Sequence, residues 1–110
     1  MTPQQTDLLQ GTLDLLVLKT LTLGPLHGWG ISKRIRQLSR DAFDVGQGSL
    51  YPALYRLEDN GFIEAEWGIS DEGKRAKVYT LTRLGRQQFA RSQNQWAMFQ
   101  TAMEHVLRAT

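Results

Sequence analysis

The fold of this chain is set by a stretch in its middle, Gly48-Ser49-Leu50-Tyr51-Pro52-Ala53-Leu54-Tyr55-Arg56-Leu57-Glu58-Asp59-Asn60-Gly61-Phe62-Ile63. Leu50, Leu54 and Leu57 recur at i, i+4 and i+7, which is the spacing of a helix with one buried face. Asn60-Gly61 supplies the left-handed residue that ends a helix, and an apolar strand follows it. The opposite face carries hydroxyl, aromatic and arginine side chains. A short helix of this kind is suited to entering a groove, and DNA is the leading candidate.

Composition indicates one folded domain. The chain has 110 residues, of which 41% are hydrophobic and 22% charged, values that are ordinary for a folded protein with one core. It contains no cysteine, which excludes disulfides and thiolate zinc sites. Residues 1–7 lack the basic segment of a signal peptide, and no apolar run reaches the length of a membrane span. We therefore expect a cytoplasmic protein with no membrane partner.

The basic residues are separated from the acidic ones along the chain. The net charge is only +2, from 13 basic and 11 acidic residues. However, residues 27–40 contain four cations and no acid, and residues 73–103 contain six cations and no acid. This pattern predicts one basic face on a nearly neutral protein. The alternative is that these runs are ordinary solvated helix faces.

The chain begins with two predicted helices. The first covers Leu8–Leu23, with Thr6 or Asp7 as its N-cap and Gly24-Pro25 as its end. It is apolar nearly all round, so one of its sides is expected to meet a second subunit. The second helix follows His27-Gly28-Trp29-Gly30, and its inward residues are predicted to be Ile31, Ile35 and Leu38. Phe43 and Val45 are expected to form a very short strand.

A hairpin and a long helix complete the chain. Strands are predicted at Phe62–Trp67 and Lys77–Thr82, with a turn over Gly68–Gly73. Thr82 is the expected N-cap of a last helix that reaches almost to Thr110 and is ~40 Å long at ~1.5 Å per residue. Its apolar residues follow a coiled-coil-like seam, which requires a partner.

These elements predict a mainly α (α+β) protein. Its fold is expected to be a winged helix-turn-helix with a two-stranded β wing and a long C-terminal dimerisation helix. Residues 1–82 would form the DNA-binding domain. Residues 83–110 would form the dimerisation helix, which packs with the first helix as a single structural unit.

The chain resembles the PadR-like transcriptional regulators, in particular the short subfamily with one C-terminal dimerisation helix. The matching segments are residues 13–16, 24–31, 48–58, 61, 66–67, 73–82 and 85. The resemblance implies a homodimeric winged-helix repressor that a small molecule or another signal releases from its operator. It also implies that the first and last helices build the dimer interface. Family members often carry Ser or Thr at the N-cap of the third helix, where this chain has Gly46.

Three elements supply the predicted DNA contacts. The third helix is expected to read base edges, the wing to hold phosphates or the minor groove, and the second helix to hold the flanking backbone. The predicted contacts are Ser49, Tyr51, Pro52, Tyr55 and Arg56, then Lys74, Arg75 and Lys77, then Lys33, Arg34 and Arg36. For Tyr51 the alternative is inward packing against the wing. For the wing cations the alternative is that they belong to an ordinary charged hairpin that does not bind DNA.

The predicted homodimer interface contains apolar residues of the first and last helices. Its members are Leu9, Leu13, Leu16, Phe89, Trp96, Phe99, Met103 and Val106. Trp96 lies in the middle of the seam and would meet its symmetry mate. Two indoles there would either sandwich a flat aromatic effector or form interface core.

Other classes of function find little support in the sequence. His27 and His105 are far apart, Ser49 has no neighbouring base, and no pair of carboxylates has catalytic spacing, so we expect no enzyme. No cluster of metal ligands is present, and neither a metal nor a cofactor is expected. The remaining alternative is a winged-helix adaptor that binds proteins instead of DNA.

Overall fold

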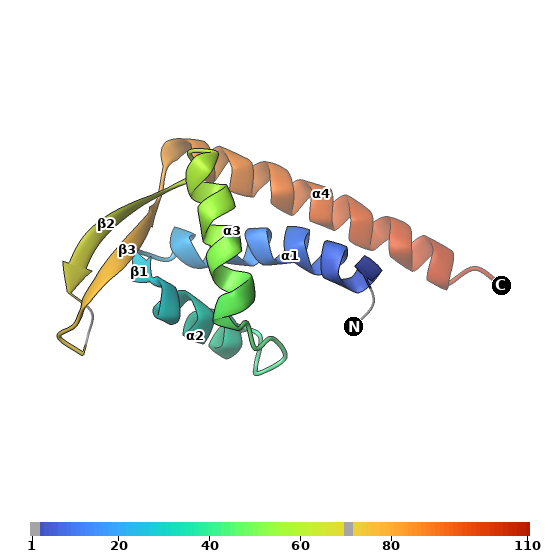
Figure 1. Ribbon diagram of the computed structural model, residues 1–110. Coiled ribbons are helices and arrows are strands. Elements are labelled where there is room, and N and C mark those ends of the chain that lie inside the picture. Colours follow the sequence, from blue (N-terminus) through green and yellow to red (C-terminus); the bar gives the residue numbers. More distant parts are fainter. Residues whose placement is uncertain (1–2, 70–71) are drawn as a thin grey trace.

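The computed structural model describes residues 3–69 and 72–110, with side chains from residue 11 onward. The described part forms helices α1 (Pro3–Thr22), α2 (Gly28–Leu38), α3 (Gln47–Asp59) and α4 (Arg83–Leu107), and strands β1 (Leu26–His27), β2 (Ile63–Ile69) and β3 (Arg75–Leu81). Helices α2 and α3 precede the β2–β3 hairpin, and α4 closes the chain (Figure 1). The prediction of a mainly α winged helix-turn-helix with a long C-terminal helix is confirmed.

The sheet differs from the prediction in three ways. It has three antiparallel strands in the order β1-β3-β2, because Leu26 and His27 pair with Tyr79 and Val78. Phe43 and Val45 do not form a strand. The hairpin is also longer than predicted, since Gly68 and Ile69 continue β2. A strand of two residues, such as β1, has no alternation of its own and depends on a neighbour that is distant in sequence.

Helix α1 lies at the centre of the fold. It packs against α2, α3, α4 and β3 (Figure 1). Its N-terminus was wrongly predicted, because the helix begins at Pro3 and includes Thr6 and Asp7. Proline suits the first turn of a helix, where its missing N–H has no partner to lose. The helix ends as predicted, just before Gly24, whose φ is +140°.

Every helix except α4 contributes fully buried side chains to the core. Helix α1 supplies Val17, Leu18 and Leu21, and the predicted leucine face of α3 is buried to 3% exposure or less. The remaining buried residues are Leu13, Thr20, Ile31, Ile35, Ala53, Ile63, Tyr79 and Leu81. Leu38 is an error of the prediction: it is the last residue of α2 and is 53% exposed.

The start of α4 is fixed to the hairpin. The predicted cap is confirmed, because Thr82 Oγ1 accepts a hydrogen bond of 3.0 Å from Gly85 N. The same hydroxyl donates to the carbonyl of Gly61 at 2.6 Å. Gly85 packs so closely that a Cβ there would lie 2.0 Å from the Phe62 carbonyl oxygen.

The far half of α4 projects from the rest of the molecule. The helix runs alongside α1 in the opposite direction and then extends past it (Figure 1). The protomer is therefore elongated, with principal extents of 57 × 29 × 24 Å. None of the helices in the described ranges is long and apolar enough to cross a bilayer.

Candidate nucleic-acid interface

The outward face of α3 is open to solvent. Ser49, Pro52 and Tyr55 are exposed, with Tyr55 at 56%. They lie on the side away from the buried leucines, since each is three positions after the one before it and residues three apart are neighbours on a helix. Gly46 caps the helix with its backbone only, since no side-chain hydrogen bond is made there. Three predicted reading residues are thus presented together.

Tyr51 packs inward, which was one of its two predicted placements. Its side chain is half-buried and its ring lies against Gly28 at the start of α2, where an added Cβ would be 2.9 Å from the Tyr51 hydroxyl oxygen. The residue lines a hollow between α2, α3 and the wing. Tyr51 therefore stands at the edge of the α3 face.

Arg56 lies four positions after Pro52, on the same side of α3, but its side chain is held by an ion pair. One of its terminal nitrogens, Nη2, lies 2.8 Å from Asp14 Oδ1 of α1, and both side chains are about one-third exposed. The predicted DNA contact is thus engaged in an ion pair within the protomer. The sequence pattern could not show this, because Asp14 is 42 residues away.

The strands of the wing carry Arg75 and Lys77 on one face and Glu64 and Glu66 on the other. Trp67 pairs with Lys77 and Ile69 with Arg75, so these four residues share one face of the hairpin. Glu64 and Glu66 occupy alternate positions and point to the other face. The Arg75 guanidinium lies 4.5 Å from the Trp67 ring centroid, and Lys77 Nζ lies 6.0 Å from it. Predicted Lys74 is exposed next to the turn.

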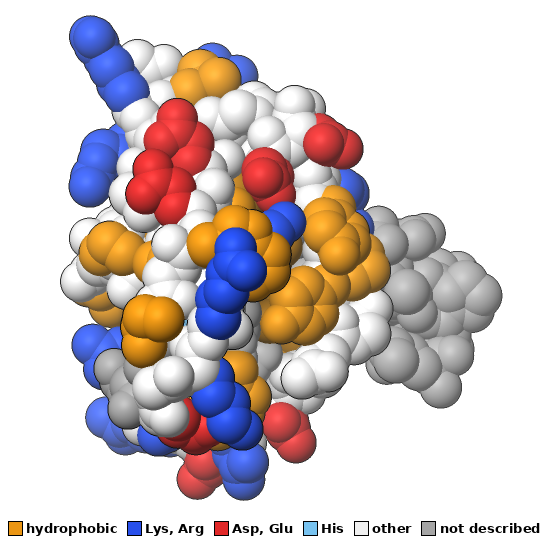
Figure 2. Space-filling model, turned by 60° about the vertical axis from the view of Figure 1, so that its left-hand side comes forward, with side chains coloured by type: hydrophobic (Ala, Val, Ile, Leu, Met, Phe, Trp, Pro, Cys, Tyr) orange, Lys and Arg blue, Asp and Glu red, His pale blue; other side chains and the backbone are white. Residues whose placement is uncertain are grey.

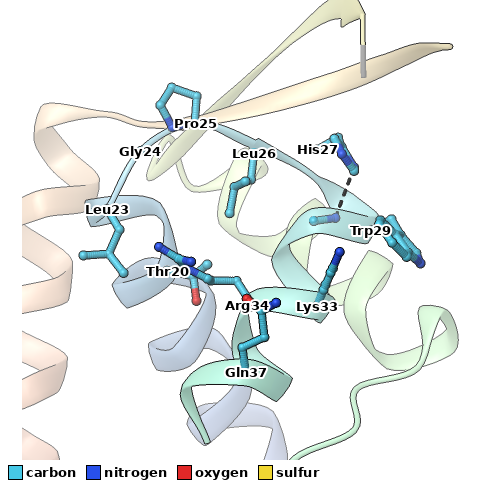
Figure 3. Close-up of a pocket in the computed structure, with 11 residues that line it drawn as sticks. Thr20, Leu23, Gly24, Pro25, Leu26, His27, Trp29, Lys33, Arg34 and Gln37 are labelled. Atoms are coloured by element: carbon cyan, nitrogen blue, oxygen red, sulfur yellow. Dashed lines mark hydrogen bonds between the residues drawn. The ribbon is translucent and has the colours of Figure 1, made fainter. Parts of the chain in front are cut away.

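The predicted cations of α2 are differently engaged, although Lys33 and Arg34 line the same hollow. Arg36 pairs with Asp41 at 3.2 Å, both side chains being exposed. Lys33 lies with its Nζ 5.1 Å from the Trp29 ring centroid. Arg34 lines a hollow of about 320 Å³ beside Thr20 and the Gly24–Leu26 segment (Figure 3). Only Lys33 is directed to the aromatic residues near the wing.

Sequence reasoning missed two tryptophans of this surface. Trp29 and Trp67 are more than half exposed, and each has a cation over its ring. Trp29 also stacks on His27 at an interplanar angle of 8°, while His27 Nδ1 accepts the 3.1 Å hydrogen bond that caps α2. Figure 2 shows hydrophobic side chains on this side of the molecule with Lys and Arg side chains against them. The alternation of Ala65, Trp67 and Ile69 was the signal available for Trp67.

One buried tyrosine stands behind the interface. Tyr79 of β3 is 2% exposed. Burial raises the pKa of Tyr79 above its ordinary value of 10.0, and electrostatic interactions with Glu58, Tyr51 and Tyr55 raise it further. The phenol is therefore neutral throughout the physiological range.

The arrangement of α2, α3 and the wing matches known regulators. A family model described as the transcriptional regulator PadR-like family matches residues 17–91, more than half of the chain. The chain belongs to the PadR-like family of transcriptional regulators. A structure of a transcriptional regulator from Clostridium thermocellum superposes with a TM-score of 0.82 and 29% identity, covering 90% of this chain and 96% of that one.

Two sequence relatives of this PadR-like protein differ in length. An uncharacterised protein of Lysinibacillus sphaericus is 33% identical over 94 residues, which are 84% of this chain and 85% of that protein. The negative transcriptional regulator PadR of Bacillus subtilis is 30% identical over 76 residues, or 69% of this chain. The match covers only 42% of the Bacillus subtilis protein.

The PadR-like chain has a second candidate surface, on α1 and α4. Trp96, Phe99, Met103 and Val106 of α4 are exposed, with Trp96 at 42%. The Trp96 and Phe99 rings are 5.7 Å apart. They line a hollow of about 490 Å³ together with Asp14, Leu15, Gln88, Gln95 and their neighbours. These four members of the predicted interface are thus accessible to a partner.

The other predicted interface residues have different positions. Leu13 is buried in the core of the protomer. Leu16 and Phe89 are partly buried and pack against that core. The side chain of Leu9 lies outside the described residues. Leu13, Leu16 and Phe89 therefore pack within one chain, and their place in a dimer interface stays a prediction.

Proposed function

We propose that this PadR-like protein is a DNA-binding repressor that acts as a homodimer on an inverted-repeat operator. The observation that carries the proposal is that the exposed face of α3 lies beside a wing whose Arg75 and Lys77 share a hollow with Tyr51 of the same helix. Ser49, Pro52 and Tyr55 would read base edges from the major groove. Arg75 and Lys77 would hold the phosphates or the minor groove, and the acids on the other wing face would point away.

The repressor role is supported by a relative, since the Bacillus subtilis protein is a negative transcriptional regulator. The dimer is supported by the apolar residues that α4 exposes in a single chain. A dimer with a twofold axis would place its reading helices about one helical turn apart, ~34 Å, and would select a symmetric operator. Such a protein would act in the cytoplasm, where its operator would lie, and would need no catalytic group.

Selection of bound fragments from genomic DNA tests this function. We expect enriched fragments to share an inverted repeat, and the affinity to fall steeply between low and moderate salt, because bound cations release counterions from DNA. Binding that is weak, unselective and indifferent to salt would contradict the proposal. The protein would then fit the alternative, a winged-helix adaptor for other proteins.

A second proposal concerns the hollow between α1 and α4. Trp96 and Phe99 offer flat apolar walls there, and Gln88, Gln95 and Asp14 offer polar groups. We propose that a small flat aromatic effector binds at this place in the dimer and releases the operator. Titration of a planar aromatic cation against the DNA complex tests it. We expect the compound to release DNA from wild type but not from Trp96→Ala. If it releases DNA equally from both, or from neither, Trp96 is part of the interface core and not an effector site.

A further inference from the structure

A hollow of about 340 Å³ lies between the wing and the first turns of α2 and α3. Its walls are largely aromatic, formed by His27, Trp29, Tyr51, Trp67 and Tyr79, and it also contains Arg75 and Lys77. None of the described residues that line it is acidic. The hollow is thus a positively charged, ring-walled depression in the surface proposed to bind DNA.

The position of the hollow defines what would cover it. In a duplex, the major and minor grooves are separated by one sugar–phosphate backbone. If α3 enters the major groove and the wing reaches the adjacent minor groove, that backbone must pass between α3 and the wing. The hollow lies between these two elements, bounded by Tyr51 on one side and by Trp67, Arg75 and Lys77 on the other.

The chemistry of the hollow fits a phosphate with its sugars. Arginine and lysine bind phosphate oxygens through charge-assisted hydrogen bonds, and a tyrosine hydroxyl donates to the same oxygens. Each cation is held near an indole, Arg75 and Lys77 by Trp67 and Lys33 by Trp29, so less side-chain freedom remains to be lost on binding. The apolar parts of the rings are free to pack against deoxyribose.

A glycine maintains the geometry of the hollow. Tyr51 Oη occupies the space in which a side chain at position 28 would begin, at 2.9 Å from an ideal Cβ. Any larger residue at position 28 would push the phenol away from α2. The absence of a side chain at Gly28 therefore leaves room for the Tyr51 hydroxyl on the α2 side of the hollow.

We propose that this hollow is a binding site for one phosphate of the DNA backbone. Arg75, Lys77 and the Tyr51 hydroxyl bind the phosphate, and Trp67 is a positioning residue for the two cations. The proposal rests on the DNA-binding function proposed above. It assigns roles to Trp67 and Tyr51 that are independent of base sequence. Their loss should therefore weaken specific and nonspecific complexes alike.

Replacing single backbone phosphates of the DNA by neutral groups tests the proposed phosphate-binding site directly. A selected genomic fragment is synthesised with one methylphosphonate at each backbone position in turn, and its affinity for the full-length protein is measured. The affinity of wild type should fall about tenfold when the methylphosphonate occupies one particular backbone position in each half-site. This is the scale of a charge-assisted hydrogen bond. Lys77→Ala and Trp67→Ala should bind the unmodified fragment more weakly and show little further loss at that position. Trp67→Phe, which keeps a ring for the cations, should retain most of the effect.

Thr80→Ala, an exposed change on the opposite wing face, is the matched control and should behave as wild type. If wild type binds no DNA, the proposed function itself fails. If wild type binds DNA but the methylphosphonates lower the affinity of Trp67→Ala and Lys77→Ala as much as that of wild type at every position, only the proposed phosphate-binding site is wrong. Thermal unfolding of each variant shows that the folded state is retained.

Tryptophan emission supplies an independent measurement. The chain has three tryptophans, so Trp29→Phe combined with Trp96→Phe leaves Trp67 as the only one. The Trp67 emission should change when duplex DNA is added, and it should return to that of the free protein when high salt dissociates the complex. Emission that is unchanged at saturating DNA would place Trp67 outside the contact and overturn the proposal.

Discussion

Neighbouring side chains on α3 have different structural roles. Tyr55 is exposed, Tyr51 packs against α2, and Arg56 is paired with Asp14 of α1. The helix turns by about 100° per residue, so adjacent residues meet different neighbours. Tyr55 and Arg56 both lie opposite the leucine face, and only Tyr55 is left available as a reading residue, because Arg56 is held by Asp14.

The ion pair of Arg56 leads to a stability prediction. Arg56→Ala and Asp14→Ala should each lower the free energy of unfolding by about 1 kcal/mol, the scale of a partly exposed pair. Because the two groups act on each other, the double variant should lose less than the sum. Chemical denaturation of the four proteins measures this. If the losses in the free energy of unfolding are additive, and Arg56→Ala alone reduces the discrimination between operator and random DNA, Arg56 is a reading residue after all.

Tyr79 makes the protein sensitive to alkaline pH. Its pKa is raised in the folded state, so below pH 10.0 both states keep the proton and the full stability is present. Above that value the unfolded chain releases the proton first, and stability falls as pH rises through the folded pKa by at most ~1.4 kcal/mol per pH unit. Unfolding curves from pH 8 to 11 measure the decline. It should be largely lost in Tyr79→Phe and only slightly reduced in Tyr55→Phe, because Tyr55 is the smallest contributor to the raised pKa of Tyr79.

Helix α3 and the wing are expected to contribute differently to DNA binding. Tyr55→Ala should reduce the ratio of operator to random-DNA affinity, because Tyr55 faces base edges. Lys74→Ala should weaken both complexes alike and lower the slope of affinity against salt by about 1, as a phosphate contact does. Binding titrations at several salt concentrations separate the two effects. The same pattern in both variants would refute this division between the elements.

The junction of the hairpin and α4 depends on Gly85. Gly85→Ala would bring a methyl group to 2.0 Å from the Phe62 carbonyl oxygen, so the helix must shift. Overpacking of this kind costs about 1–3 kcal/mol, more than the ~1 kcal/mol that alanine contributes to helix propensity. Thermal unfolding should show a lower midpoint. Gly11→Ala, where nothing lies within 4 Å of the new methyl, is the control and should be neutral or stabilising.

The whole protomer exposes apolar surface that one chain cannot cover. Trp96 and Phe99 are exposed beside α1, and Met103 and Val106 are exposed farther along α4. We expect a homodimer at micromolar concentration in sedimentation experiments, and Trp96→Ala should raise its dissociation constant by at least tenfold, since buried aromatic residues dominate interfaces. Val78→Ala, a change in the wing, should leave the dimer unchanged. A monomeric wild type would contradict this prediction.

Periodicity was sufficient to predict the helices, the hairpin and their order, because each depends on residues close together in the chain. The leucine face of α3, the Thr82 cap and the Asn60-Gly61 helix end are local features, and all three agree with the structure. The pairing of β1, the ion pair of Arg56 with Asp14 and the inward placement of Tyr51 join segments far apart in sequence. The aromatic hollow beside the wing arises in the same way. Such contacts form only when the core fixes the distances between elements, and no local pattern specifies them.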